Sequence, residues 1–362
     1  MKPGTLYNLQ ALRGIAVLLV LWRHSFVIGE RNNRSGIEIP EIWKIGEGGV
    51  DLFFVISGFV MVLITPGRFG CPREIGPFLY QRFTRIYPLY WIYSLMILAI
   101  YFINPRMVNS SQGGQVDIFA SFLLLPQDIM PLLGQGWTLE FEVYFYLVFA
   151  LLLLAPERLL PALLLLWGAI VAAGWNLGLA DDSTPLLHLV CNPLTVEFIL
   201  GAFLALALRR HWRRGALLSL CGGFALLLAG SLWVDLHQFA GLRLFYYGLP
   251  AVMIVYGAVA LEKESGRRFP RWIEAVGDAS YSIYLSHILV VSTVGRVWKT
   301  LPIPLNGVWN LAGVIICMAV AAVAFGLASH RYLEKPLLRA FRERRLPRFS
   351  LPFIGGQKSQ EL

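Results

Sequence analysis

The chain has 362 residues, of which 57% are hydrophobic and 15% are charged, whereas an average soluble domain has roughly 45 to 50% apolar and about 25% charged residues. This composition excludes an ordinary soluble domain and favours a protein whose solvent is the lipid bilayer. The net charge of +9 does not indicate a nucleic-acid partner, because the basic residues follow membrane topology instead.

Apolar runs near the length that crosses the hydrocarbon core, roughly 20 helical residues, recur along the whole chain. They predict an all-α integral membrane protein, a bundle of about ten transmembrane helices. The ten runs are 9–28, 48–65, 86–103, 137–155, 159–177, 190–208, 215–233, 244–261, 279–297 and 308–329.

Lys and Arg residues are distributed unequally between the loops. With the N-terminus inside, the cytoplasmic segments hold 23 of the 31 Lys and Arg residues, seven lie outside or at outer ends, and Arg23 lies within a span. This asymmetry is the positive-inside rule, and it predicts an even number of spans with both termini cytoplasmic. The first run has no compact charged region before it and no cleavage site after it, so we interpret it as a retained span.

One membrane domain accounts for most of the sequence, since no polar stretch is long enough for a second domain. We predict a membrane domain over residues 1–335 and a short basic cytoplasmic tail over residues 336–362. The four cysteines are scattered, and the His, Asp and Glu residues lack the spacings of metal ligands. We therefore predict no metal site.

The first run contains two polar residues that are expensive to place in a bilayer, Arg13 and His24. Eleven residues separate them, which leaves both on nearly one helical face. They are expected to line one polar channel from the cytoplasmic side. A plainer explanation makes Arg13 a head-group anchor and gives His24 a backbone carbonyl partner.

Two carboxylates are predicted at the depth of His24. Asp51 lies three residues inside the second run and Glu142 five residues inside the fourth, both counted from the outer side. A histidine held by a carboxylate can take a proton from a hydroxyl at neutral pH. Asp51 is expected to orient His24 or balance Arg23, and Glu140 ranks behind Glu142 because it is shallower and faces elsewhere.

Two further clusters stand out. Arg82 and Arg85 lie one turn apart at the cytoplasmic end of the third run, where paired guanidinium groups bind phosphate, although a positive-inside anchor also explains them. His287 and Ser286 lie in the middle of the ninth run, where polar groups can also serve as contacts between helices. No nucleophile elbow supports a Ser-His hydrolase.

Several motifs, taken in chain order, resemble those of a known family. They are the Arg13 and His24 pair, GGVDLFFVISGF at 48–59, RFTR at 82–85, WTLEFE at 137–142, SYSIYLSH at 280–287 and EKP at 334–336. Together they resemble the acyltransferase 3 family of bacterial multi-pass membrane O-acyltransferases, along essentially the whole chain.

The resemblance implies an inner-membrane enzyme that transfers an acetyl group from acetyl-CoA to a sugar hydroxyl of an exported or cell-surface polysaccharide or its lipid-linked precursor. Arg82 and Arg85 would hold the phosphates of acetyl-CoA, and His24 would be the essential catalytic residue. We further expect Arg13 to help bind acetyl-CoA, and Glu142 and Asp51 to orient His24 or stabilise its cation. His24 would act either as general base or as a transient acyl carrier, and His287, Ser286 and Trp137 are expected to bind the acceptor. The expected partners are that acceptor, membrane lipid and other polysaccharide-assembly proteins.

Two other functions compete with this interpretation. A transporter or flippase of a lipid-linked glycan would use buried charges to line its path, and it would work without acyl-CoA. A membrane sensor or scaffold would use the basic tail to bind anionic lipid, but it leaves His24, Asp51 and Glu142 unexplained.

Overall fold

The computed structural model describes residues 6–32, 41–109, 112–180, 184–209, 214–233, 242–301 and 307–343. Within these ranges the chain is helical and forms no strand. The predicted tail falls in two parts. Its beginning is helix α14 (Lys335–Glu343), and residues 344–362 lie outside the described ranges.

Ten long helices occupy the ten predicted runs, which confirms the all-α class. They are α1 (Tyr7–Asn32), α2 (Gly48–Ile64), α3 (Ile75–Ile103), α5 (Gly136–Leu152), α6 (Leu160–Asn176), α8 (Leu194–Arg209), α9 (Ala216–Trp233), α10 (Leu249–Ser265), α12 (Ser280–Thr300) and α13 (Gly307–Ser329). Among the described residues, seven helical segments are long and apolar enough to cross a membrane, and α5, α9 and α12 are not among them. The chain is thus a multi-pass protein by helix length and composition, and the count of ten remains a prediction.

Short helices connect or extend the long ones. The connectors with 3₁₀ geometry are η1 (Glu41–Glu47), η2 (Pro72–Glu74), η3 (Pro105–Met107) and η5 (Glu157–Leu159), and the π-helical turns are η7 (Leu244–Gly248) and η8 (His330–Glu334). Three short α-helices complete the set, namely α4 (Ile118–Leu123), α7 (Pro185–Cys191) and α11 (Arg271–Asp278).

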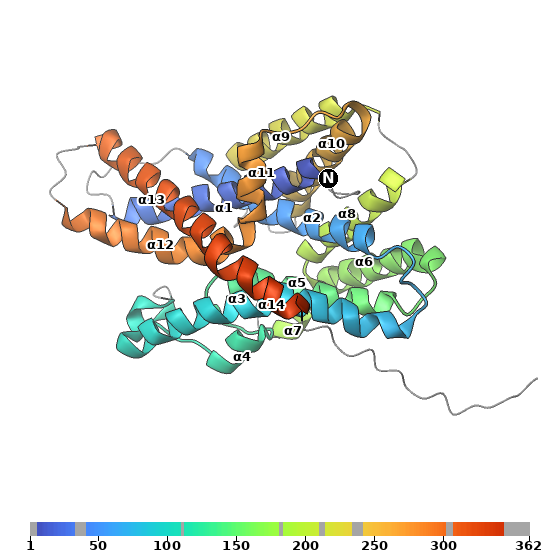
Figure 1. Cartoon of the computed structure of the whole chain (residues 1–362), viewed down its shortest axis with the longest axis horizontal. Helices are drawn as coiled ribbons and strands as arrows, with labels where there is room; N and C mark the ends of the chain where they lie inside the picture. Colours follow the sequence, from blue (N-terminus) through green and yellow to red (C-terminus); the bar gives the residue numbers. More distant parts are fainter. Residues whose placement is uncertain are drawn as a thin grey trace, which may run out of the picture.

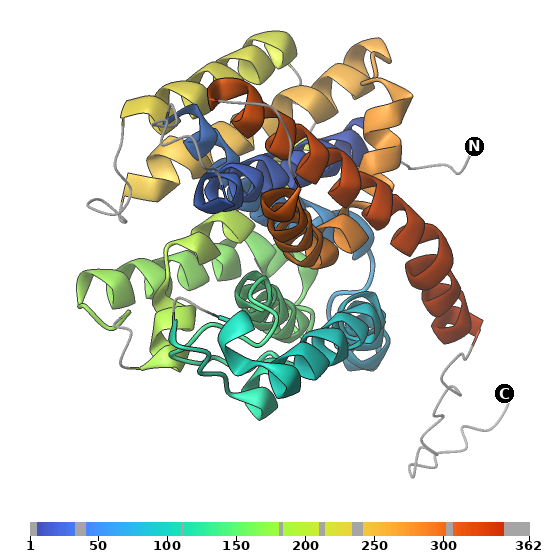
Figure 2. The ribbon, with the colours of Figure 1, turned by 90° about the vertical axis from the view of Figure 1, so that its left-hand side faces the viewer.

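Helix α1 lies in the interior of the bundle. It packs against α2, α10, α11, α12 and α13. Two views at right angles show α9 and α10 on one side of it and α3, α4 and α5 on the other (Figures 1 and 2). Polar residues in the middle of α1, such as Arg13 and His24, are therefore at least partly covered by neighbouring helices.

Segments predicted to share the cytoplasmic side do lie together. The Glu262 carboxylate at the end of α10 accepts hydrogen bonds from the backbone N–H groups of Tyr7 and Asn8, at 3.0 and 2.7 Å. These are free donors of the first turn of α1, which need a partner from outside the helix. On α3, Tyr80 donates to the carbonyl of Phe341 in α14 at 3.1 Å. This clustering agrees with the predicted topology, while the orientation in the membrane remains a prediction.

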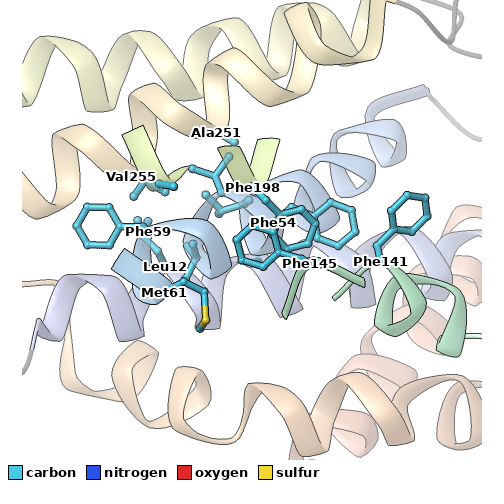
Figure 3. Packing of buried hydrophobic residues seen from close by; sticks show 14 of the residues in the cluster. Leu12, Phe54, Phe59, Met61, Phe141, Phe145, Phe198, Ala251 and Val255 are labelled. Atoms are coloured by element: carbon cyan, nitrogen blue, oxygen red, sulfur yellow. The ribbon is translucent and has the colours of Figure 1, made fainter. Parts of the chain in front are cut away.

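An aromatic stack joins α2, α5 and α8 in the buried core. The rings of Phe54 and Phe198 have centroids 4.5 Å apart, and those of Phe145 and Phe198 are 4.3 Å apart (Figure 3). All three side chains are at most 3% exposed. Stacked pairs of this kind add about 0.5 to 1.5 kcal/mol each beyond the area they bury, so the stack fixes α5, which carries Glu142, against α2.

Helices α2 and α8 approach each other through glycine. A Cβ atom placed on Gly58 would overlap the carbonyl oxygen of Phe198, and one placed on Gly201 would overlap that of Val55. Small residues permit this approach between membrane helices. At Gly58 and Gly201 the backbones of α2 and α8 are in contact, and a larger side chain would not fit there.

Replacing Gly58 by leucine is expected to lower the free energy of unfolding by about 1 to 3 kcal/mol, as overpacking typically does. The measurement is the melting temperature of the purified protein in detergent. Gly76→Leu is the matched control, because nothing lies within 4 Å of a Cβ atom on Gly76. Equal melting temperatures for the two variants would contradict the close approach.

Candidate active site

Two cavities meet inside the bundle, and we name them after the predicted topology. The inner cavity has a volume of about 120 Å³ and is lined by Arg13, Arg82, Arg85, Glu142 and Tyr146, among others. The outer cavity has a volume of about 760 Å³, and its wall includes His24, Trp137 and four arginines. Val50 and Tyr284 line both, so a shared wall separates the two chambers.

Two histidine rings lie in edge contact beside the outer cavity. The ring centroids of His24 and His287 are 4.9 Å apart, with 66° between the ring planes. Nδ1 of His24 lies 2.8 Å from the Val20 carbonyl oxygen, and Nδ1 of His287 lies 2.6 Å from that of Tyr284. Because a carbonyl oxygen can only accept, both Nδ1 atoms carry a hydrogen.

This assignment determines what the remaining nitrogens can do. His287 Nε2 lies 3.4 Å from His24 Nδ1, so it faces a hydrogen and must present its lone pair. The N–H of His24 is then shared between the Val20 carbonyl and His287. Among the described residues, Nε2 of His24 has no hydrogen-bond partner, and in the neutral ring it has a lone pair with which to take a proton.

The inner cavity gathers the three arginines that the sequence singled out. Arg85 forms an ion pair with Glu334, which also accepts hydrogen bonds from Ser282 at 2.6 Å and His330 at 2.8 Å. Arg82 differs, because its Nε is buried and has no hydrogen-bond partner in the described part of the chain. Arg82 is therefore a donor available to a ligand, whereas Arg85 is largely held by the protein.

Glu142 belongs to the inner cavity and lies among these arginines. Its carboxylate accepts hydrogen bonds from Tyr146 and, at 3.4 Å, from Ser57. The structure does not bring His24 and Glu142 to one cavity, since His24 lines the outer cavity and Glu142 the inner one. Glu140 is buried, accepts from Gln127 at 2.9 Å and lines a third cavity.

Asp51 has a different partner from either one predicted. Arg243 binds both of its carboxylate oxygens, at 3.0 and 2.7 Å, and Asp51 is fully buried. Arg23 instead pairs with Glu47 at 3.1 Å. Asp51 neither balances Arg23 nor contacts His24, because it turns toward the segment that precedes η7. Depth in the membrane did not reveal which way the side chain faces.

The predicted acceptor residues divide into two groups. Trp137 lines the outer cavity. His287 and Ser286 are at most 1% exposed, and Ser286 donates to the Ser282 carbonyl at 2.8 Å. Direct contact of these two residues with an acceptor does not fit their burial, and His287 lies behind His24 instead.

Sequence reasoning missed three residues that shape the site. Glu334 holds Arg85, Tyr146 donates to Glu142, and Arg243 holds Asp51. The EKP motif already marked Glu334 without showing its partner. Arg243 carried a signal as a basic residue on the predicted outer side, where such residues are uncommon. In the described part of the chain, no cluster of His, Cys, Asp and Glu has an arrangement that would hold a metal ion.

Comparison with known proteins identifies the family of this chain. A family model described as an acyltransferase domain matches residues 6–331. Exopolysaccharide production protein ExoZ of Rhizobium meliloti (strain 1021) is 32% identical over 315 residues, covering 84% of this chain and 93% of the relative. Acyltransferase MdmB of Streptomyces mycarofaciens is 27% identical, covering 93% of each chain.

A third relative is longer than this chain. Peptidoglycan O-acetyltransferase OatA of Listeria monocytogenes serovar 1/2a is 25% identical, and the match covers 93% of this chain but 57% of the relative. No solved structure matches the chain. Since the family model covers almost the whole membrane bundle, and both cavities with it, the chain belongs to the acyltransferase 3 family.

Proposed function

We propose that this protein transfers an acetyl group from acetyl-CoA to a sugar hydroxyl of an exported or cell-surface polysaccharide or of its lipid-linked precursor. The names of two relatives support the polysaccharide acceptor, one an exopolysaccharide production protein and the other a peptidoglycan O-acetyltransferase. The observation that carries the proposal is the pair of cavities that meet at one wall. The inner cavity is cationic, and beside the outer cavity lies His24 Nε2, which has no hydrogen-bond partner among the described residues.

The positive charge of the inner cavity suits the anionic acetyl donor, acetyl-CoA. Arg13, Arg82 and Arg85 line it, and the unpaired Nε of Arg82 is a donor that an oxyanion would satisfy. Its volume of about 120 Å³ is well below the roughly 300 to 1,000 Å³ of a pocket for a drug-sized ligand. The cavity therefore takes only part of acetyl-CoA, with a phosphate of the donor at the arginines and the adenosine outside.

His24 is the general base of the proposed reaction. When bound, acetyl-CoA supplies an activated acyl carbon. The sugar oxygen forms a bond to this carbon as the carbon–sulfur bond breaks, and the hydroxyl proton moves to His24 Nε2. The resulting imidazolium is stabilised at Nδ1 by the Val20 carbonyl and by His287. The CoA sulfur leaves as a thiolate, and the proton on Nε2 then passes to it, which restores the neutral imidazole.

The hydrogen bond at Nδ1 also favours a general-base role of His24 over a role as a covalent acyl carrier. A neutral acetyl-imidazole would have to lose its Nδ1 hydrogen, which would point a lone pair at the Val20 oxygen 2.8 Å away. A base keeps that hydrogen throughout. With radiolabelled acetyl-CoA and no acceptor, the denatured protein should therefore carry no label, and label on His24 would show the carrier role instead.

His287 acts through His24 and not on the substrate. Replacing His287 by alanine removes one acceptor from His24 Nδ1 and should lower kcat for acetyl transfer about 3- to 10-fold, consistent with the net contribution of about 1 kcal/mol typical of one hydrogen bond. The KM for acetyl-CoA should stay within about twofold, because His287 lies outside both cavity walls. His287→Gln, whose amide oxygen can accept, should recover part of kcat. An unchanged kcat in His287→Ala would contradict the positioning role.

The proposal places the protein in the inner membrane of a bacterium, with membrane lipid and other polysaccharide-assembly proteins around it. The seven apolar helical segments support a membrane location. A transporter of a lipid-linked glycan is the alternative.

The test measures the acetate content of the exported polysaccharide by proton NMR in cells with and without the gene, and in deletion cells that express the chain again. Loss of acetate at unchanged polymer yield, restored by the chain, would support the acetyltransferase. Collapse of the yield would favour the transporter. Acetate that survives the deletion would contradict the proposal.

A further inference from the structure

The outer cavity is surrounded by basic residues. Arg23, Arg31, Arg243 and Arg296 line it, and among the described residues of its wall Glu47 is the one carboxylate. Only eight Lys and Arg residues lie on the predicted outer side or within a span, and four of these eight line this cavity. Membrane topology does not explain this concentration. The positive-inside rule works against basic residues here.

The four arginines are not equivalent. Arg23 is paired with Glu47 and Arg243 with Asp51, so both charges are compensated by the protein. Arg31 and Arg296 are exposed, and neither has a hydrogen bond or ion pair within the described ranges. These two guanidinium groups are free to bind an anion from the cavity.

Arg31 and Arg296 stand in line with the catalytic histidine. On α1, Val20, His24, Val27 and Arg31 all line the cavity, and on α12, Ile288, Ser292 and Arg296 follow at four-residue steps. Such spacings form one stripe along a helix, and α1 packs against α12. Seven residues from His24 to Arg31 correspond to a rise of about 10 Å, which is longer than one sugar ring.

We propose that the acceptor carries an oxyanion, bound by Arg31 and Arg296, at a distance of more than one sugar ring from the hydroxyl that faces His24. The inference rests on the proposed function and names the class of acceptor within it. A carboxylate on an acidic sugar and the phosphate that joins a glycan to its lipid share this chemistry. Both accept the paired hydrogen bonds that guanidinium groups donate.

The experiment measures dissociation constants for the full-length protein in nanodiscs at low salt. One arm compares tri-galacturonate with neutral galactotriose, and the other compares farnesyl diphosphate with farnesol. At least one acidic probe is expected to bind about 10-fold or more tightly than its neutral counterpart, since hydrogen bonds to charged groups are each worth about 1.5 to 3 kcal/mol. The arm that responds identifies the source of the oxyanion.

The variant R31Q/R296Q should lose this preference. The matched control is R158Q/R271Q, which removes two charges from exposed arginines outside the wall of the outer cavity and should keep it. If neither acidic probe binds better than its neutral counterpart, or if R31Q/R296Q keeps the preference, the proposal is wrong.

Binding of acetyl-CoA is measured on the same samples, so that two kinds of failure can be told apart. R31Q/R296Q should bind acetyl-CoA as the wild type does, because neither arginine lines the inner cavity. An acidic preference without acetyl-CoA binding would overturn the acetyltransferase and leave the anion site standing. Acetyl-CoA binding without a preference for the acidic probes would overturn the anion site and leave the acetyltransferase standing.

Discussion

Replacing His24 by alanine should lower kcat/KM for acetyl transfer by about 10²- to 10⁴-fold, the range that a positioned general base contributes. The physical reason is specific to one atom. Nδ1 is committed to the Val20 carbonyl and His287, so Nε2 alone can take the hydroxyl proton, and alanine removes it. The measurement is acetyl transfer to acceptor by the purified protein, with acetyl-CoA binding measured in parallel.

Two further variants separate chemistry from folding. His24→Gln keeps a polar side chain but cannot take a proton, so its activity should fall nearly as far as that of His24→Ala. His188→Ala is the matched control, because His188 also faces a backbone carbonyl, that of Ala180 at 3.3 Å, but lines neither the inner nor the outer cavity. Activity in His24→Gln within about tenfold of wild type would rule out His24 as the base.

Helices and shared helix faces were predictable from the sequence because each depends on one periodicity. Apolar runs located all ten long helices. Arg82 and Arg85, one turn apart, do line a single cavity, and so does Arg13 on another helix. Spacing along one helix sets the relative direction of its side chains, which is why the shared face of Arg82 and Arg85 was predictable. The prediction that Arg13 and His24 of α1 line one channel was not confirmed, because Arg13 lines the inner cavity and His24 the outer one.

Contacts between residues of different helices were harder to predict than the shared face of one helix. Counting residues from an interface gives the depth of a side chain but leaves its rotation about the helix axis open. Asp51 was placed near His24 by depth, yet it faces Arg243, which is 192 residues away in the chain. Such a partner follows from how α2 packs, and that packing depends on close contacts such as those of Gly58 with α8.

The hydrogen positions on His24 also required the fold. The sequence identified a histidine within a predicted span. Which of its ring nitrogens can act as the base depends on the Val20 carbonyl four residues earlier and on His287 from another helix. The same is true of Arg82 and Arg85, which look alike in the RFTR motif. Their difference comes from Glu334 on η8, which engages Arg85 and leaves Arg82 available.

That difference makes Arg82 the better probe of donor binding. Replacing Arg82 by glutamine should raise the KM for acetyl-CoA about 10- to 100-fold, since a hydrogen bond to a charged group is worth about 1.5 to 3 kcal/mol, and should change kcat less. Arg85→Gln is a poorer test, because it would leave the Glu334 carboxylate, which is 2% exposed, with only His330 and Ser282 as partners. Breaking a buried ion pair by removing one partner destabilises a fold by about 3 to 5 kcal/mol.

A second arginine nearby in the chain, Arg73, provides the control for the Arg82 test. Arg73→Gln removes an exposed arginine nine residues earlier that does not line the inner cavity, so its KM should match that of the wild type. Arg82→Lys keeps the charge but loses the planar donor geometry, and it should fall between the wild type and Arg82→Gln. A KM in Arg82→Gln equal to that in Arg73→Gln would mean that acetyl-CoA does not use the inner cavity, and the donor would have to reach His24 from the outer one.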